Sequence, residues 1–403
     1  MDAKDKIVSS INTGDKTTKD EPWLQIHIVG SVKGGCGKTA FSLFKALEIA
    51  REEREQIIQK GSARYAERKD RKAPVLWLDA DFKGTGSKAL LYGKDEQTFE
   101  YMNRGCTLKD LEGEYSEIIY DGNPSREKNW LRFDSGYVAY TINDYLRGDI
   151  KEPEKMIVRG HAYKDELQKG INEDDRDEDE VDHGVGVGRI VMDINGFLDF
   201  IFSSPDSQDK KIFQYGGNLP TVEIGRFTYY MQKILTEIYE MGRMDTNAAK
   251  KTKASVRWDL GYRHIVLDMP PGDDAYSEAL VDMIYKWAGK QKKGGIQIHH
   301  YLMTTSDRGH VEAMLSELKD ITQRLKKYPA GEGVELAVVL SEVSKEEFKH
   351  GKVLDSIKKS LENFDGIKIV KSCYQEEYYL FCRGDLAADD PKEKWFAYNI
   401  EEV

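Results

Sequence analysis

The sequence predicts an α/β protein whose core is a mostly parallel, twisted β-sheet flanked by helices. Short runs of Val, Ile and Leu, bounded by turn residues, alternate with stretches of helical periodicity, and this alternation is typical of buried parallel strands joined by crossover helices. The best of these strands also end in polar, glycine-containing loops, as the strands of ligand-binding α/β sheets do. The length of 403 residues suffices for one large domain with insertions or for two domains of ordinary size.

Seven strands are predicted from the apolar runs, and two helices from their amphipathic stripes. Within 39–50, Leu43 and Leu47 share one helical face, and 227–241 has the same periodicity. The sequence after Ala50 is almost wholly charged, so we expect the first helix to project past the sheet as a solvated extension or to lead into a long exposed connector. The predicted strands are 24–30, 75–79, 198–202, 264–268, 296–303, 334–340 and 367–370.

The overall charge argues against a surface that coats nucleic acid. With 60 Lys and Arg against 71 Asp and Glu, the formal net charge is -11, although a local basic patch remains compatible with that balance. DNA therefore stays open as a partner. Two basic clusters stand out in the sequence, the first formed by Lys250, Lys251, Lys253 and Arg257 and the second by Lys290, Lys292 and Lys293.

Cysteine usage and hydropathy indicate a soluble, cytoplasmic protein. The four cysteines, Cys36, Cys106, Cys373 and Cys382, form no CxxC pair, so we expect reduced thiols and neither a zinc site nor a disulfide framework. The N-terminus has no apolar signal segment, and no apolar run is long enough to span a bilayer. The segment 397–403 is short and acidic, so we expect no membrane anchor there.

The clearest motif lies between the predicted strand 24–30 and the predicted helix 39–50. It reads Lys33-Gly34-Gly35-Cys36-Gly37-Lys38-Thr39. Glycines allow consecutive backbone amides to point at phosphate oxygens, and a helix N-terminus adds a favourable dipole. The pattern predicts that Lys38 contacts the β and γ phosphates and that the hydroxyl of Thr39 binds Mg²⁺. The predicted phosphate-binding residues are Gly34, Gly35, Cys36, Gly37, Lys38 and Thr39.

Carboxylates follow two of the other predicted strands. Asp79 and Asp81 alternate at the end of strand 75–79, at the edge where ligands sit in open α/β sheets, although Asp also often caps such loops. Asp268 ends strand 264–268, where a carboxylate can hold Mg²⁺ through water. Gly272 follows it and would let the backbone approach the γ-phosphate and respond to its loss.

These three motifs, in this order, resemble those of the ParA/MinD family of ATPases. The first resembles the family's deviant Walker A box, KGGxGK[ST]; the Asp79–Asp81 segment is similar to its switch I; and DMPPG, at 268–272, resembles its Walker B and switch II sequence, DxPPG. The resemblance implies bound ATP and Mg²⁺, with Lys33 reaching in trans to the phosphates of a second subunit. It also implies that Asp81 orients the attacking water, while Asp79 is structural or near the metal.

The resemblance divides the chain into three parts. Residues 1–22 are predicted to be a polar extension, 23–345 a P-loop ATPase domain, and 346–403 a segment that completes or packs on that domain. The long interval between Asp81 and Asp268 predicts surface insertions at about 148–190 and 244–259, the first with eight acidic residues in 173–182. Ser341-Glu342 stands where the family often has an Asn for adenine, and the lack of an N-K-x-D sequence favours ATP over GTP by default.

Three functions fit these motifs. The first is a switch in which ATP holds an ATP-dependent homodimer together, hydrolysis resets it, and a regulatory or cargo protein partner reads the change, as in positioning, partitioning or assembly. The second is an ATP-dependent synthetase or ligase of the wider superfamily, although such enzymes usually lack the lysine of the KGG sequence. The third is an ATP-gated module that binds DNA or protein through the basic clusters.

Overall fold

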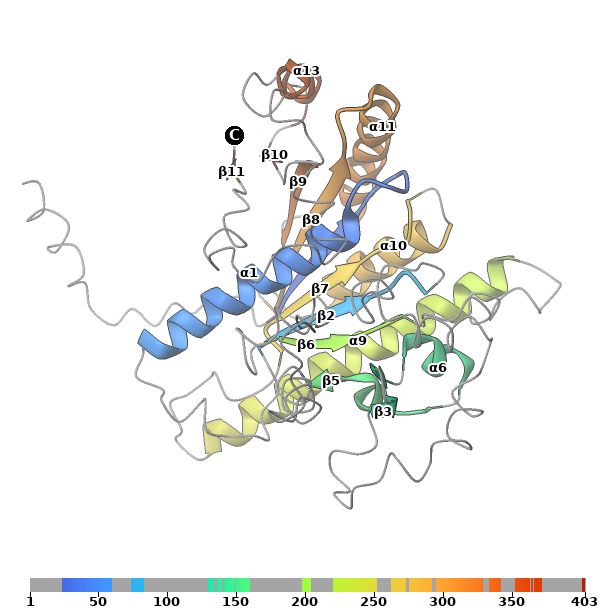
Figure 1. Ribbon diagram of the computed structural model, residues 1–403, viewed down its shortest axis with the longest axis vertical. Coiled ribbons are helices and arrows are strands. Elements are labelled where there is room, and N and C mark those ends of the chain that lie inside the picture. The colour runs from blue at the N-terminus through green and yellow to red at the C-terminus, as the bar shows by residue number, and fades with distance from the viewer. Residues whose placement is uncertain are drawn as a thin grey trace, which may run out of the picture.

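A nine-stranded β-sheet forms the centre of the computed structural model (Figure 1). The structure describes residues 24–59, 74–82, 130–133, 136–139, 141–148, 150–159, 198–203, 220–251, 262–272, 275–291, 295–328, 333–341, 352–362, 364, 366–371 and 401–402. The strand order is β11-β10-β9-β8-β1-β7-β2-β6-β5. Seven neighbouring strands run parallel, and a short antiparallel strand borders each edge. The predicted fold class, a mostly parallel sheet flanked by helices, is confirmed.

The parallel strands agree closely with the apolar runs of the sequence. Four of them have the predicted bounds, whereas β6 ends one residue earlier, β8 continues to Thr304, and β10 is shifted by one residue. The parallel strands are β1 (Leu24–Gly30), β2 (Val75–Asp79), β6 (Leu198–Ile201), β7 (His264–Asp268), β8 (Ile296–Thr304), β9 (Val334–Leu340) and β10 (Lys368–Lys371). The antiparallel edge strands, which were not predicted, are β5 (Val158–Arg159) and β11 (Glu401–Glu402).

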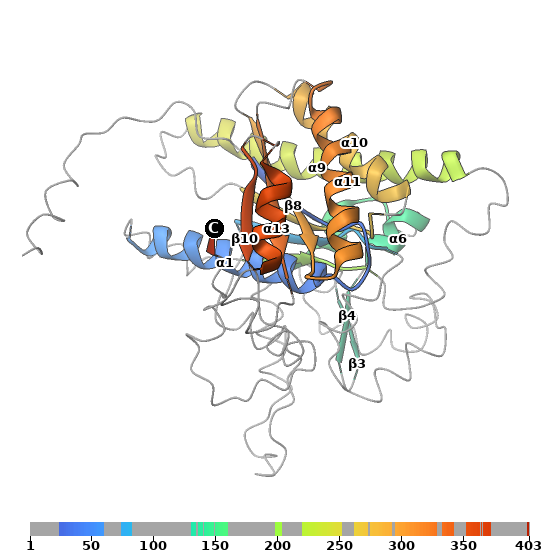
Figure 2. The same ribbon diagram turned by 90° about the horizontal axis from the view of Figure 1, so that it is seen from above.

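Helices cover both faces of the sheet (Figures 1 and 2). Helix α1 lies on one face, and α9, α10 and α11 lie on the other. Helix α1 continues through the charged segment after Ala50, as expected for an extension, whereas α9 is longer than predicted because it begins at Pro220 and ends at Lys251. The helices are α1 (Lys38–Gln59), α6 (Ile142–Arg147), α9 (Pro220–Lys251), α10 (Ala275–Lys290), α11 (Arg308–Leu325) and α13 (Lys352–Leu361), with a 3-10 turn η4 at Pro153–Met156.

The largest apolar core lies between the sheet and the α9–α11 layer. Alternate residues of β1, such as Ile26 and Ile28, are fully buried there against apolar residues of α10 and α11. The intervening His27 faces the α1 side, as does Trp77 of β2, whose Nε1 donates to Ser42 Oγ of α1 at 2.9 Å. The period of two along each strand therefore separates the two layers.

A hairpin and helix α6 lie between β2 and β6 in the chain, and neither was predicted. The hairpin pairs β3 (Trp130–Phe133) with β4 (Gly136–Ala139). The predicted first insertion, 148–190, starts with buried residues, including Ile150 and Met156, and contains β5. The predicted second one, 244–259, contains the end of α9.

Several sequence-based expectations fall outside the described residues. These are the polar extension 1–22, the acidic run 173–182, Lys253, Arg257, Lys292, Lys293, Cys106, Cys373 and Cys382. Among the residues that the structure does describe, no helix has the length and apolarity needed to cross a membrane.

Candidate functional site

The loop between β1 and α1 has the backbone conformation that its glycines permit. Gly35 and Gly37 adopt φ values of 78° and 73°, in the left-handed region that side chains disfavour. A Cβ added at Gly34 or Gly35 would meet no heavy atom within 4 Å, so this side of the loop is open. Helix α1 begins at Lys38, which places the unpaired amides of a helix N-terminus at the loop, as an anion site requires.

The sheet brings Asp79 and Asp268 together, because β2 and β7 are neighbours with these two residues in register. Asp268 is 1% exposed, and Lys38 and Thr39 lie close enough to its carboxyl to influence its pKa. Burial raises the pKa of the Asp268 carboxyl well above its usual value, and the neighbouring Asp79 raises it further, whereas Lys38 and Thr39 act in the opposite direction. Lys38, Thr39 and Asp268, three of the predicted site residues that are not glycines, thus lie close together.

Asp268 retains a buried oxygen suited to a cation. Its Oδ1 atom has no hydrogen-bond partner within the described part of the chain, and an unsatisfied buried carboxylate oxygen is costly unless a ligand or water completes it. The hydroxyl of Thr39 and the carboxylate of Asp268 are oxygen donors of the kind that Mg²⁺ prefers. The residues present therefore fit the predicted metal. No group of three His, Cys, Asp or Glu residues within the described ranges could hold a metal by itself.

Asp79 anchors the backbone that carries Asp81. The amide of Asp81 donates to Asp79 Oδ1 at 2.9 Å, and Ser203, which follows β6, donates from its hydroxyl to Asp79 Oδ2 at 2.6 Å. Asp79 is 1% exposed, whereas Asp81 is partly exposed. These contacts agree with the structural role considered for Asp79 and leave its metal role a prediction.

Gly272 lies against the phosphate loop. Its amide donates to the carbonyl of Ser31, and a Cβ added at Gly272 would lie 2.6 Å from that carbonyl oxygen. The amide of Met269 also donates to the carbonyl of Val29 at 3.1 Å. The loops after β1 and β7 are therefore joined directly, and only glycine fits at position 272 without a shift of the backbone.

The side chain of Lys33 reaches the start of α11. Its side chain is exposed, and a Cβ added at Gly309, near the start of α11, would lie 3.2 Å from Lys33 Nζ and 3.1 Å from Asp307 Oδ1. Asp307 caps α11, since its side chain accepts from the amide of His310. In a single copy of the chain, the ammonium group of Lys33 thus lies beside the first turn of α11.

Ser341, Thr305 and His310 also stabilise the loop between β1 and α1, a role that the sequence alone did not indicate. Ser341, considered above for adenine recognition, donates from Oγ to the carbonyl of Cys36 at 2.7 Å. The thiol of Cys36 lies 3.5 Å from His310 Nδ1, which is 2.8 Å from the hydroxyl of Thr305. A polar residue within two positions after β6, β8 and β9 is the signal that could have identified Ser203, Thr305 and Ser341.

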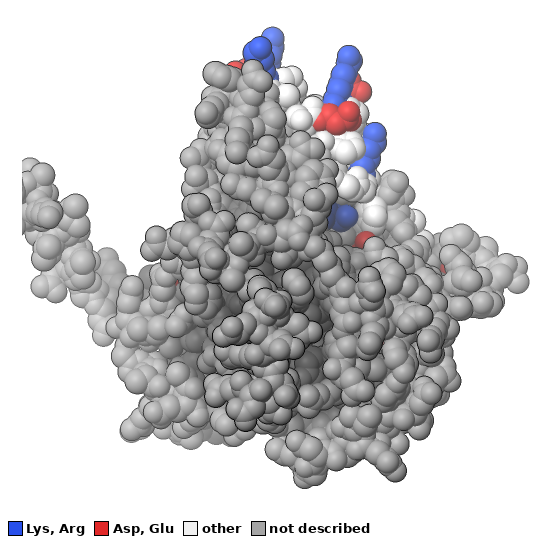
Figure 3. All heavy atoms as spheres, in the orientation of Figure 1, with Lys and Arg blue, Asp and Glu red and all other residues white. Residues whose placement is uncertain are grey.

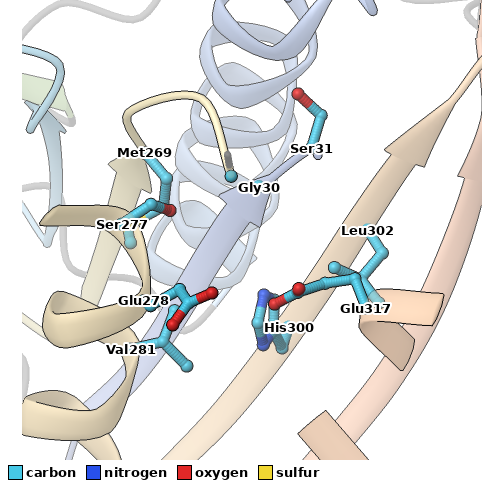
Figure 4. A pocket seen from close by; sticks show the side chains of 10 residues that line it. Gly30, Ser31, Met269, Ser277, Glu278, Val281, His300, Leu302 and Glu317 are labelled. Atoms are coloured by element: carbon cyan, nitrogen blue, oxygen red, sulfur yellow. The ribbon is translucent and has the colours of Figure 1, made fainter. Parts of the chain in front are cut away.

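A small pocket lies behind the phosphate loop, between α10 and α11 (Figure 4). His300 lies at its floor, where burial lowers the pKa of the imidazole to about 3. Burial also raises the pKa of Glu317 at its rim. The carboxylates Asp79, Asp81 and Asp268 are not among its lining residues, which are Gly30, Ser31, Met269, Gly272, Ser277, Glu278, Val281, His300, Leu302 and Glu317.

Charges of both signs are mixed on the described surface. In Figure 3 blue and red side chains lie together over α11 and α13, and Arg308 pairs with Glu312 at 2.7 Å within α11. Of the two basic clusters noted in the sequence, Lys290 is exposed, and the side chains of the others are outside the described residues. On the described part of the face drawn in Figure 3, basic and acidic residues are therefore interspersed.

Comparisons with solved structures find proteins of the class that the motifs indicated. McdA from Cyanothece in a complex with ATP has 14% identity and a TM-score of 0.42, over 90% of this chain and 88% of that one. A Borrelia burgdorferi protein described as a plasmid partition protein, bound to AMPPNP, has 11% identity and a TM-score of 0.42, over 93% and 95%. The cell division ATPase MinD from Pyrococcus furiosus has 12% identity and a TM-score of 0.40, over 92% and 94%.

No protein-family profile matches the sequence, and no curated protein matches it. The fold and the loop between β1 and α1 define the class, a P-loop NTPase fold similar to those of ParA- and MinD-type ATPases.

Proposed function

We propose that this chain is a Mg²⁺-dependent ATPase that acts as a partner-regulated dimerisation switch. The observation that carries the proposal is the convergence of Lys38, Thr39 and Asp268 at an open glycine loop, with one buried carboxylate oxygen of Asp268 left for a metal ligand. The motif order at 33–39, 79–81 and 268–272 supports the same conclusion.

Each residue then has a distinct task. The amides of the 34–39 segment and the ammonium group of Lys38 would hold the phosphates. Thr39 and Asp268 would hold Mg²⁺, which when bound would neutralise charge on the phosphates. Asp81 orients a water molecule toward the γ-phosphorus. The new P–O bond forms as the bond from the γ-phosphorus to the β–γ bridging oxygen breaks, so ADP leaves. One proton of the water stays on the attacking oxygen, and the other passes to a second oxygen of the inorganic phosphate.

A second copy of the chain would complete the site. Lys33 is exposed and extends from its own loop to the start of α11, so its ammonium group is free to approach a facing subunit without disturbing the core. A cation supplied in trans stabilises charge on the transferred phosphoryl group only while two subunits are together. Once the γ-phosphate has been hydrolysed and released, the contact of Lys33 with it across the two subunits is lost, so the dimer would dissociate. A partner protein that binds only the dimer or only the monomer would respond to that change.

The test is to measure ATP binding, ATP turnover and molecular mass in solution with ATP, with ADP and without nucleotide. We expect a dimer with ATP alone. Lys38→Ala should lose nucleotide binding, whereas Asp81→Ala should bind ATP and accumulate as a dimer without turnover. Lys45→Ala is a matched control, because Lys45 lies on α1 beyond the loop and pairs with Glu48. ATP binding by Lys38→Ala at the level of the unmodified chain would rule out the proposed phosphate site.

A further inference from the structure

Helix α6 contacts the segment that carries Asp81 at the residue that follows Asp81 in the chain. Asn143 donates from Nδ2 to the carbonyl of Phe82, the residue after Asp81, at 3.0 Å. Both partners are shielded from water, since Asn143 is 0% exposed and Phe82 is 1% exposed. A buried amide-to-carbonyl bond fixes a backbone more firmly than a solvated one, because the low local dielectric strengthens it and no water can replace it.

Helix α6 is itself fixed at its start. Thr141 and Asp144 form a reciprocal capping box, in which each side chain accepts from the other's backbone amide. The amide of Ile142 donates to the carbonyl of Phe202 at 2.8 Å. Because Phe202 directly follows β6, the short helix is attached to the sheet at the same edge as Asp79 and Asp268.

Side chains of α9 hold the other end of α6. Arg226 donates from Nη2 to the carbonyl of Leu146 in the last turn of α6, at 3.2 Å. The rings of Tyr145 and Tyr230 lie edge to face with centroids 5.4 Å apart, and Lys233 Nζ lies 5.7 Å from the centre of the Tyr145 ring. Helix α6 therefore connects α9 with the loop after β2.

The ring of Phe82 closes a second connection. It lies 4.8 Å from the ring of Phe227 in α9 and 5.3 Å from the ring of Tyr276 in α10, while those two rings are 5.4 Å apart. The three aromatic side chains thus form a closed, buried triad. Because Tyr276 lies in the first turn of α10, after the loop that contains Gly272, the triad connects the Asp81 segment with the segment that contacts the phosphate loop.

Asp81 is consequently held between two anchors. Its own amide is bonded to Asp79 on one side, and the next residue, Phe82, is held through its carbonyl and its ring on the other. We propose that Asn143 and Phe82 are positioning residues, which keep the Asp81 carboxylate at the place where it orients the attacking water. This inference rests on the role proposed above for Asp81.

The decisive variant is Asn143→Leu, which keeps the branched shape and the number of heavy atoms of the side chain and removes the donor. We expect kcat for ATP hydrolysis to fall by about tenfold or more, because small displacements of a catalytic group are costly. We expect the KM for ATP to change by less than about threefold, because the phosphate loop is untouched. Phe82→Leu, which removes the ring from the triad, should have the same effect on kcat.

Two control variants separate positioning from general loss of stability. Tyr276→Phe keeps the ring of the triad and loses only the hydroxyl, which contacts Glu223 at 3.4 Å, so kcat should stay near that of the unmodified chain. Ile238→Val makes a small cavity in α9 away from the Asp81 segment and should lower the melting temperature without lowering kcat.

Hydrogen exchange provides a readout that does not depend on ATP hydrolysis. In Asn143→Leu without nucleotide, amide exchange of a peptide covering 75–82 should become faster, while exchange of a peptide covering 24–41 should be unchanged. If exchange at 75–82 becomes faster in Asn143→Leu but the unmodified chain does not hydrolyse ATP, the anchoring by Asn143 is supported and the proposed function is overturned. Unchanged exchange and a kcat within about twofold of the unmodified value in folded Asn143→Leu and Phe82→Leu would overturn the positioning role.

Discussion

Two fully enclosed histidines should make the folded protein sensitive to mild acid. His27, on β1, is 4% exposed and lies between His264 of β7, with ring nitrogens 3.2 Å apart, and His299 of β8, whose ring stacks at 4.7 Å. Burial lowers the pKa of His27 well below its usual value, and His264, His299 and Lys45 lower it further. His300, beneath the pocket of Figure 4, is 2% exposed, and burial lowers its pKa to about 3.

The size of the effect follows from proton linkage. In the unfolded chain both histidines titrate near the ordinary pKa of about 6.5, while in the folded chain they stay neutral. The unfolded state therefore takes up protons first, so the stability is fully present above about pH 6.5 and decreases as the pH falls toward the folded pKa. Between pH 7.5 and 5.5 this amounts to roughly 1–2 kcal/mol per histidine, against a typical total of about 5–15 kcal/mol.

The assay is the free energy of unfolding by urea at pH 7.5 and at pH 5.5, for the unmodified chain and for His27→Gln and His300→Gln. Each variant should reduce the difference between the free energies of unfolding at the two pH values by roughly 1–2 kcal/mol, because glutamine does not titrate. Ile28→Val is the control, since it weakens the same strand equally at both pH values. If both glutamine variants kept the full pH dependence of the unmodified chain, the acid sensitivity would not come from these two imidazoles.

Three further substitutions test the loops and the α1 interface. Gly272→Ala should lower ATP turnover, measured as phosphate release, because its Cβ would lie 2.6 Å from the carbonyl oxygen of Ser31. Gly37→Ala should destabilise the loop by about 1–2 kcal/mol, since φ is 73° there, and should weaken ATP affinity in a binding titration. Trp77→Phe should lower the free energy of unfolding by about 1–2 kcal/mol, because the buried bond to Ser42 is lost, while ATP binding is retained.

Each of these substitutions also has an outcome that would contradict its premise. Normal phosphate release by Gly272→Ala would mean that the loop after β7 can move away from β1 at no cost to hydrolysis. Unchanged ATP affinity in Gly37→Ala would show that the left-handed conformation is not needed for binding. A Trp77→Phe protein as stable as the original in urea would remove the hydrogen bond to Ser42 from the list of stabilising contacts.

The parallel strands could be predicted because each is a buried run of apolar residues that ends in a polar loop. The run of β1 ends at Gly30 and that of β7 at Asp268, where the residue type changes abruptly. The edge strands β5 and β11 have only two residues each, so no alternation could develop in them. Their pairing depends on neighbours that are distant in the chain, and a local pattern does not contain that information.

The site could be predicted in part for the same reason. Motif residues such as Lys38 and Asp268 are recognisable because phosphate and Mg²⁺ binding require particular groups at particular spacings. The residues that hold the motifs in place carry no such pattern. Thr141 and Asp144 did have the spacing of a capping box, which could have indicated α6, but nothing local to Asn143 shows that its amide meets Phe82.

The position of β1 in the sheet has a consequence for how the protein is made. Both strands that border β1 are synthesised late: His27 and its contact His264 are 237 residues apart, and β8 follows β7. A ribosome-bound chain that ends before β7 would have the glycine loop and α1 but two unpaired edges on the strand that supports them, which invites aggregation. The capacity to capture a nucleotide should therefore be acquired only when the segment up to Thr304 has emerged, and incomplete products should depend on chaperones until then.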